Sequence, residues 1–245
     1  MKTAIIIPAR MASQRFPNKP MANIVGVPMI ERVWRQGTKA NIGEVFVACS
    51  EREVFDHITS VGGRAIMTDP DLPSGTDRIF AAYNSLQNKD EYESIINLQG
   101  DMPLIDPKNI KSVNLPLING FEIGTISTNI SENEEKNENI TKVIIDWKKL
   151  NTLGNSVDFY KSSKRKLLNI YQHVGIYSFR PTALKKFITL PPSKNEIEKK
   201  LEQLRALDAG IKIGITYVEN IAISVDTIED LKIVEKIIKE KNDIN

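Results

Sequence analysis

Three cations follow a short apolar run near the start of the sequence. The run is Ala4 to Ile7, and Arg10, Arg15 and Lys19 come after it in a stretch that contains prolines. A loop at the carboxyl end of a buried strand is where an open α/β sheet binds its ligand, and arginine forks with a lysine point charge suit a polyphosphate. Glycine-rich phosphate fingerprints are absent, so side chains would have to contact the phosphates. We expect phosphate binding here, the alternative being a solvated basic loop.

Two carboxylates also follow expected strands. Asp101 comes after Asn97-Leu98-Gln99-Gly100, and Asp226 follows the apolar stretch that ends at Val225. Mg²⁺ prefers one or two carboxylates together with phosphate oxygens and water, so the pair predicts a metal site. Each acid also has an ordinary interpretation. Asp101 would be a turn residue, and Asp226 would form a capping box with Glu229 at the start of the last helix.

Other polar residues carry weaker signals. Ser74-Gly75-Thr76-Asp77-Arg78 opens an expected helix, where free backbone N–H groups favour an anion or a polar base edge. Ser74 or Thr76 can at the same time be a plain N-cap. Of the two histidines, we expect His57 at the surface and His173 as a structural histidine on a strand.

The elements that must position these residues alternate between short apolar runs and amphipathic stretches. This alternation predicts an α/β fold with a doubly wound, mostly parallel sheet. Ser50 with Glu53 has capping-box spacing, and Pro28 suits a first helical turn. Strands are expected at residues 4–7, 45–48, 95–98 and 221–225, and helix faces at Ile30-Val33-Trp34, Val54-Phe55-Ile58-Val61 and Ile79-Phe80-Tyr83-Leu86.

From about residue 122 the pattern changes to strands without regular crossover helices. We expect strands at 123–130, 142–147 and 171–179, and then one helical stretch through Ile197, Leu201, Leu204 and Leu207. Residues 131–139 and 161–166 are the expected loops. We expect a single domain over residues 1–245, with an added β-rich section at about 122–215.

Composition limits the classes of partner. The 33 basic and 31 acidic residues give a net charge of +2, so no overall field favours nucleic acid or an anionic membrane. The apolar run at residues 4–7 is too short for a signal or a membrane span. One cysteine, Cys49, excludes an internal disulfide and a cysteine zinc cluster, and is expected to be a buried small side chain. We expect a cytoplasmic protein.

Together these segments resemble the 3-deoxy-manno-octulosonate cytidylyltransferases, also called CMP-Kdo synthetases. The resemblance spans almost the whole chain in the right order and implies a fold like that of the nucleotide-diphospho-sugar transferases. The motifs that carry it are I-I-P-A-R-x-x-S-x-R-x-P-x-K-P at 6–20, S-G-T-x-R at 74–78, Q-G-D-x-P at 99–103, H-x-G-I-Y at 173–177, E-Q-L-R at 202–205 and D-T-x-E-D at 226–230.

The resemblance implies attack of a sugar-acid hydroxyl on the α-phosphate of CTP, with Arg10, Lys19, Asp101 and Asp226 as catalytic residues. It further implies a homodimer formed through the β-rich section. By the same resemblance, CTP would contact Ala9, Arg10, Ser13, Arg15, Lys19, Ser74, Thr76, Arg78 and Gln99. Mg²⁺ would be held by Asp101 and Asp226, and the sugar acid would be held by Gln99, Lys161, His173, Tyr177, Glu202 and Gln203.

Two departures concern the acceptor. Met102 stands where family members usually carry Glu, and Lys161 can replace an arginine that grips the sugar carboxylate, without its bidentate geometry. The acceptor is therefore left open among Kdo, an amino-substituted Kdo such as 8-amino-Kdo and another 3-deoxy-2-keto sugar acid such as a nonulosonic acid. Two further alternatives are a nucleotidyltransferase acting on a sugar 1-phosphate and an inactive homologue kept as a binding module.

Overall fold

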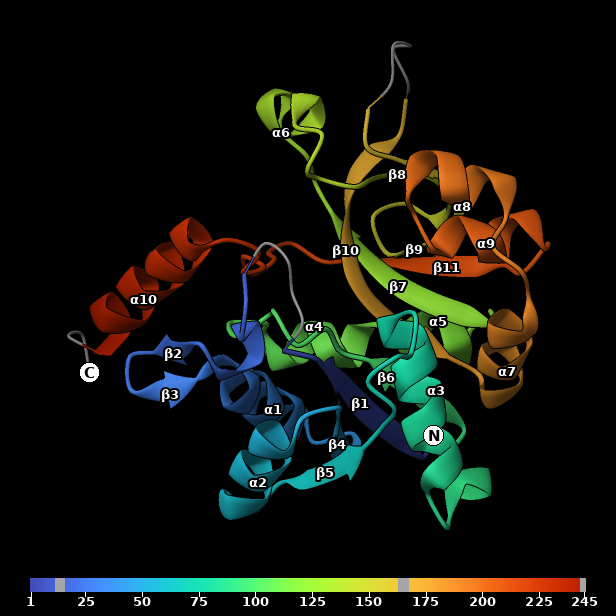
Figure 1. Cartoon of the computed structure of the whole chain (residues 1–245). Coiled ribbons are helices and arrows are strands. Elements are labelled where there is room, and N and C mark those ends of the chain that lie inside the picture. Colours follow the sequence, from blue (N-terminus) through green and yellow to red (C-terminus); the bar gives the residue numbers. More distant parts are fainter. Residues whose placement is uncertain (12–15, 163–167, 243–245) are drawn as a thin grey trace. The chain divides into compact units, whose positions relative to one another are not determined.

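The computed structural model describes residues 1–11, 16–162 and 168–242, and the side chains of these residues as far as 240. Contacts divide the chain into two compact units (Figure 1). Unit 1 comprises Met1–Ile110 and Ala222–Asn245, and unit 2 comprises Lys111–Ile221. The predicted single domain stays a prediction.

Unit 1 contains four parallel strands in the order β5-β4-β1-β6. Side chains of β1, β4 and β6 are mostly aliphatic and buried, as expected for parallel strands covered by helices, whereas the edge strand β5 is partly exposed. The parallel arrangement predicted for this part of the chain is confirmed. The strands are β1 (Thr3–Ala9), β4 (Gly43–Cys49), β5 (Arg64–Met67) and β6 (Ser94–Asn97).

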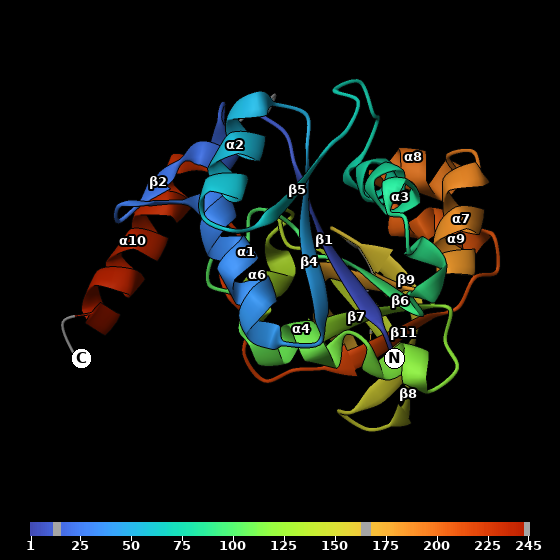
Figure 2. The same cartoon turned by 90° about the horizontal axis from the view of Figure 1, so that it is seen from below.

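Helices cover both faces of these strands. In Figure 2, α1 (Met29–Ala40) and α2 (Arg52–Ser60) lie on one face, and α3 (Gly75–Ser85) lies on the other. All three predicted helices are confirmed, although Val61 and Leu86 are C-caps rather than helical residues. Shorter elements are η1 (Lys19–Met21), the hairpin strands β2 (Asn23–Ile24) and β3 (Val27–Pro28), and η2 (Lys89–Glu91).

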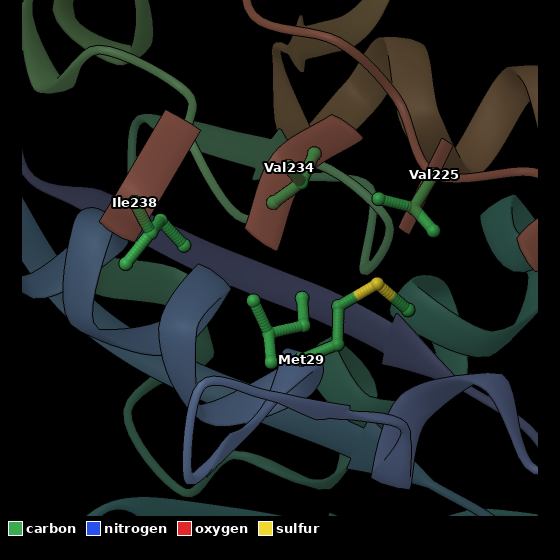
Figure 3. Packing of buried hydrophobic residues seen from close by; sticks show 5 residues of the cluster. Met29, Val225, Val234 and Ile238 are labelled. Atoms are coloured by element: carbon green, nitrogen blue, oxygen red, sulfur yellow. The ribbon is translucent and has the colours of Figure 1, made fainter. Parts of the chain in front are cut away.

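The end of the chain returns to unit 1. Helix α10 (Ile228–Asn242) lies beside the β2–β3 hairpin, as both cartoon views show (Figures 1 and 2). Val234 and Ile238 of this helix form a buried cluster with Ile24, Met29 and Val225 (Figure 3). Burial of five aliphatic or thioether side chains, each contributing about 1.5–3 kcal/mol, holds the carboxyl-terminal segment against α1.

Unit 2 begins within α4 (Pro107–Ser112) and is dominated by antiparallel pairing. Its strand order is β10-β7-β11-β9-β8, and a further pairing of β10 with β8 closes the ladder on itself. Among the described strand pairs of unit 2, β11 and β7 are the parallel neighbours. The strands are β7 (Ile123–Thr128), β8 (Lys142–Lys149), β9 (Leu153–Tyr160), β10 (Ile170–Phe179) and β11 (Ile213–Tyr217), and the helices are α5 (Leu115–Ile118), α6 (Glu132–Lys136), α7 (Pro181–Thr189), α8 (Lys194–Lys199) and α9 (Gln203–Asp208).

Several predicted boundaries are wrong for identifiable reasons. Residues 221–225 form no strand, and the nearby strand is β11. The single helical stretch through Leu201 is two helices, because Lys200 adopts a left-handed conformation with φ of 54°. The predicted loop at 131–139 contains α6, which Ser131 and Glu134 start with a capping box.

The predicted capping box at α2 is also wrong. The N-cap of α2 is Glu51, and its side chain makes no capping hydrogen bond. Pro28 is the N-cap of α1, one residue before the predicted first turn.

No helix in the described part of the chain combines the length and the apolar character needed to cross a lipid bilayer.

Candidate active site

Lys19, Asp101 and Asp226 meet in unit 1, although they are far apart in sequence. Lys19 Nζ donates to Asp101 Oδ2 at 2.8 Å and to Asp226 Oδ1 at 3.3 Å. It also donates to the backbone carbonyl of Val225 at 2.9 Å. The side chains of Lys19 and Asp101 are 17% and 24% exposed, so this ion pair is only partly screened by water. The structure thus brings together the three residues predicted to be at the catalytic centre.

The backbone holds the two acidic segments together. Val225 N donates to the carbonyl of Asp101 at 2.9 Å, and the Val225 side chain is anchored in the cluster of Figure 3. Gly100 permits the close approach of β1, because a Cβ at this position would lie 2.8 Å from the carbonyl oxygen of Pro8. Any larger residue would have to displace backbone there.

Asp226 does not cap the last helix, contrary to its ordinary interpretation in the sequence. Asp230 Oδ2 accepts hydrogen bonds from the backbone N–H groups of Asp226 at 3.0 Å and Thr227 at 2.8 Å, and from Thr227 Oγ1 at 2.9 Å. Thr227 Oγ1 in turn accepts from Asp230 N at 3.2 Å. Thr227 and Asp230 therefore form the reciprocal cap that was predicted for Asp226 and Glu229. The Asp226 carboxylate contacts Lys19.

The donor set fits a divalent cation. One ammonium group faces two carboxylates, so the ionised cluster carries an excess negative charge that favours a further cation. Two carboxylate ligands are enough for Mg²⁺ when substrate phosphates and water complete its octahedron. Among the described residues, no group of three or more His, Cys, Asp and Glu side chains could hold a metal through protein ligands alone. Met102 is buried, at 6% exposed.

The first loop begins at the carboxyl end of β1. Ala9 is the buried last residue of this strand, and Arg10 is exposed immediately after it. Glu51, at the end of the neighbouring strand, anchors the loop, because its Oε1 accepts a hydrogen bond from the Met11 N–H at 3.1 Å. Ser13 and Arg15, which were predicted to bind CTP, lie outside the described residues.

The second predicted nucleotide cluster opens α3. Ser74 is the N-cap, and its Oγ accepts from Thr76 N and Asp77 N, as predicted. Thr76 is buried, at 4% exposed. Gln99, another predicted nucleotide contact, follows β6, and its Nε2 donates to Oδ1 of Asn97, the last residue of that strand, at 2.9 Å.

Arg78 is 1% exposed, so it is a buried cation rather than a surface contact. Its guanidinium donates to Thr68 Oγ1 at 2.6 Å and to the carbonyls of Asp69 and Pro70 at 3.1 and 3.4 Å. Burial lowers the pKa of Arg78, and the charge of Glu51 partly opposes this. The structure therefore shows Arg78 positioning the loop before α3, while direct contact with nucleotide stays a prediction.

Residues predicted to bind the sugar acid lie in unit 2. His173, on β10, has its Nε2 3.1 Å from Thr125 Oγ1, and its ring centroid lies 5.4 Å from that of Tyr177. Burial lowers the pKa of His173 from 6.5 to about 3. Burial, with the nearby charge of Glu202, raises the pKa of Tyr177 well above 10. Both side chains are therefore neutral near pH 7.

Three further predicted sugar residues are placed at element ends. Glu202 is the N-cap of α9, and Gln203 is its first residue. Lys161 directly follows β9 and is partly buried. Its backbone carbonyl accepts a hydrogen bond at 2.6 Å from Nζ of Lys142, a lysine that is wholly buried.

The comparisons with known proteins agree with these motifs. A family model described as Cytidylyltransferase matches residues 4–213. A 3-deoxy-manno-octulosonate cytidylyltransferase of Paramagnetospirillum magneticum is 40% identical over 238 residues, which is 96% of this chain and 97% of the relative. That of Rhodopseudomonas palustris is 41% identical over 244 residues, covering 97% and 98%. The chain belongs to the 3-deoxy-manno-octulosonate cytidylyltransferase family.

A solved structure supports the same conclusion at the level of the fold. It is CMP:2-keto-3-deoxy-manno-octonic acid synthetase in complex with CTP, and it matches with a TM-score of 0.90 and 32% identity. The match covers 98% of this chain and 100% of the other. The family resemblance predicted from the motifs is confirmed, and the mixed α/β fold is that of a nucleotidyltransferase.

Sequence reasoning did not single out four residues that support predicted site residues: Glu51, Thr125, Lys142 and Asp230. For two of them the sequence held a signal. Glu51 lies three residues past the end of the strand expected at 45–48, and Asp230 is the last residue of the D-T-x-E-D motif. Thr125 and Lys142 gave none, because a buried hydroxyl and a buried ammonium are revealed only by strand pairing.

Proposed function

We propose that this chain transfers the cytidylyl group of CTP to the anomeric hydroxyl of 3-deoxy-manno-octulosonate, giving CMP-Kdo and pyrophosphate. The observation that carries the proposal is the convergence of Lys19, Asp101 and Asp226 in a member of this family. Such transfer depends on positioning and charge neutralisation more than on covalent catalysis, so no nucleophilic Ser or Cys is required.

The residues of unit 1 would act on the nucleotide. Arg10 and Lys19 would bind the phosphates and stabilise charge on the departing pyrophosphate, and Gln99 would contact both nucleotide and sugar acid. Asp101 and Asp226 would hold Mg²⁺, which when bound supplies charge that polarises the α-phosphate. Asp230 would keep Asp226 in place through the backbone of residues 226 and 227.

The residues of unit 2 would recognise the sugar acid. Neutral His173 and Tyr177 can exchange hydrogen bonds with hydroxyl groups, and Lys161 offers a positive charge to the carboxylate. Lysine lacks the bidentate arginine fork, so the sugar side of the site differs from the one that the resemblance implies, and 8-amino-Kdo is the specific variant of the acceptor to test.

We further propose a homodimer formed through the β-rich section. Large apolar side chains of this part of the chain are exposed, and their burial by a second copy would be favourable. Light scattering of the purified protein would decide between one copy and two. The exposed residues are Leu150 at 71%, Val157 at 55%, Leu168 at 78% and Ile197 at 64%.

We also propose that the reaction takes place in the cytoplasm, where CTP is available, and that its product supplies a surface glycan such as lipopolysaccharide or capsule. Both parts of this proposal rest on the family.

The test is release of pyrophosphate from CTP and Mg²⁺ in the presence of single acceptors. The panel contains Kdo, 8-amino-Kdo, a nonulosonic acid and a sugar 1-phosphate, and mass spectrometry identifies the CMP-sugar. We expect release with Kdo or its 8-amino form. Release with the sugar 1-phosphate alone, or CTP binding without release for any acceptor, would overturn the proposal.

A further inference from the structure

Thr125 makes three polar contacts through one hydroxyl group. It lies on β7, is wholly buried, and faces the irregular part of β10 between Val174 and Tyr177. Its Oγ1 lies 2.7 Å from the carbonyl oxygen of Ile176, 3.1 Å from that of Val174 and 3.1 Å from Nε2 of His173. A hydroxyl has one proton to donate, so these contacts cannot all be donations.

The position of that proton follows from the chemistry of the partners. Carbonyl oxygens only accept, and two oxygens 2.7 Å apart repel unless a proton lies between them. The hydroxyl of Thr125 must therefore donate to the Ile176 carbonyl. It is then left as an acceptor for the histidine, which requires the hydrogen of His173 to be on Nε2.

The other ring nitrogen of His173 is left as an acceptor. A neutral imidazole carries one hydrogen, so a ring protonated at Nε2 has a lone pair on Nδ1. Among the described residues, Nε2 is the ring nitrogen of His173 that has a hydrogen-bond partner, whereas the ring nitrogen Nδ1 has none. The ring packs against Phe159, with centroids 5.0 Å apart and planes at 80°, and against Tyr177, with centroids 5.4 Å apart and planes at 45°. The low pKa of about 3 keeps the ring neutral at working pH.

We propose that Thr125 fixes His173 as the Nε2–H tautomer, so that Nδ1 accepts a hydrogen bond from a hydroxyl or ammonium group of the sugar acid. This inference rests on the proposed function, which assigns His173 to the sugar. It makes Thr125 a positioning residue. It also means that His173 does not bind the carboxylate of the sugar acid, because Nδ1 and the carboxylate are both acceptors. The sugar carboxylate must then be bound by another group, such as Lys161.

The first experiment measures the tautomer directly. The sequence contains two histidines, so long-range ¹H–¹⁵N spectra of histidine-labelled protein at pH 7 should show the signals of two imidazole rings. The spectrum of His57→Gln identifies which of these signals belong to His173. We expect His173 to be protonated on Nε2 in the substrate-free protein. In Thr125→Val, which cannot accept from the ring, the Nδ1–H form should become populated. A wild-type ring protonated on Nδ1 would overturn the inference whatever the variants do.

The second experiment separates positioning from stability. In Thr125→Val we expect KM for the sugar acid to rise about tenfold, as for loss of one hydrogen bond, with KM for CTP within about twofold of wild type. Thr125→Ser keeps the hydroxyl and should restore both the tautomer and KM. Equal increases in both KM values, or no rescue by serine, would contradict the inference.

Failure of the proposed function would look different. The wild-type protein would then release no pyrophosphate with any sugar acid, whereas the spectra would still report the tautomer. If Thr125→Val does not fold, as circular dichroism would show, the wild-type spectrum and the Thr125→Ser kinetics still decide the question. An ammonium partner would be revealed by preference for 8-amino-Kdo over Kdo that is lost with Thr125→Val.

Discussion

Lys19 Nζ lies 2.8 Å from Asp101 Oδ2, an ion pair between residues 82 positions apart in the sequence. It joins the loop after β1 to the loop after β6, the neighbouring parallel strand. The carboxyl ends of neighbouring parallel strands meet at one edge of a sheet, which is where open α/β folds bind ligands. The same nitrogen contacts Asp226, so one cation holds the two acidic residues that we assign to Mg²⁺.

The first prediction concerns the role of Asp101. Replacement by Asn keeps the size of the side chain but removes the charge that would bind Mg²⁺. We expect pyrophosphate release to fall by about a hundredfold or more, while the dissociation constant of CTP changes by about threefold or less. Steady-state kinetics and isothermal titration with CTP measure the two quantities. The control is Asp90→Asn, at an exposed position on η2, which should behave as wild type. Near-normal turnover of Asp101→Asn would refute the metal assignment.

The central strands and helices of unit 1 could be predicted because each shows a regular pattern of apolar residues and ends at residues that are typical of caps or loops. The apolar run Ala4 to Ile7 is buried throughout, and Ser74 caps α3 as its type and position indicate. These are local signals. The place of Asp101 was predictable from the rule for strand ends, because it follows β6. The place of Asp226 was predictable only from the family motifs, because residues 221–225 form no strand.

The residues that sequence reasoning misplaced are those whose conformation is decided by distant partners. The stretch 221–225 is apolar enough for a strand, but Val225 instead bonds to the Asp101 carbonyl and packs against Met29. In the sequence, Glu51 lies at the start of an expected helix and shows no sign of a special role. In the structure, its carboxylate accepts a hydrogen bond from the Met11 N–H. Neither partner can be inferred from local periodicity.

The second prediction concerns Asp230, which caps α10 and holds the backbone of Asp226. Replacement by Ala removes the acceptor of three hydrogen bonds, so we expect the free energy of unfolding to fall by about 1 kcal/mol. Because Asp226 is then less well held, the Mg²⁺ concentration for half-maximal turnover should rise by about threefold or more. Urea unfolding and a Mg²⁺ titration of activity measure these effects.

Glu229→Gln is the matched control, since Glu229 is the neighbouring exposed acid that a capping box with Asp226 would have used. It should leave stability and Mg²⁺ dependence unchanged. A larger effect of Glu229→Gln than of Asp230→Ala would show that the cap is assigned to the wrong residue.

The third prediction concerns Lys142, a wholly buried lysine that donates at 2.6 Å to the carbonyls of Asn137 and Lys161. Burial lowers its pKa. Replacement by Met fills the space but leaves both carbonyls without this donor, so stability should fall by about 2–3 kcal/mol. Since Lys161 is then less well held, KM for the sugar acid should rise more than KM for CTP. Lys149→Met, an exposed position on the same strand, is the control, and equal losses in both variants would argue against this role.

The last prediction concerns the pH dependence of stability contributed by His173. Its pKa is about 3 in the folded protein and 6.5 when it is exposed, so between these values the unfolded chain binds one more proton than the folded chain. Unfolding is therefore favoured as pH falls, by about 1.4 kcal/mol per pH unit, and above pH 6.5 the contribution is constant. Urea unfolding at pH 7, 6 and 5 should show wild type losing stability more steeply than His173→Gln. All other titrating groups are common to both proteins, so the difference in slope reports His173 alone. Parallel pH profiles would mean that the folded ring takes up a proton at the same pH as the exposed ring, so that below about pH 6.5 Nδ1 would be a donor instead of an acceptor for the sugar.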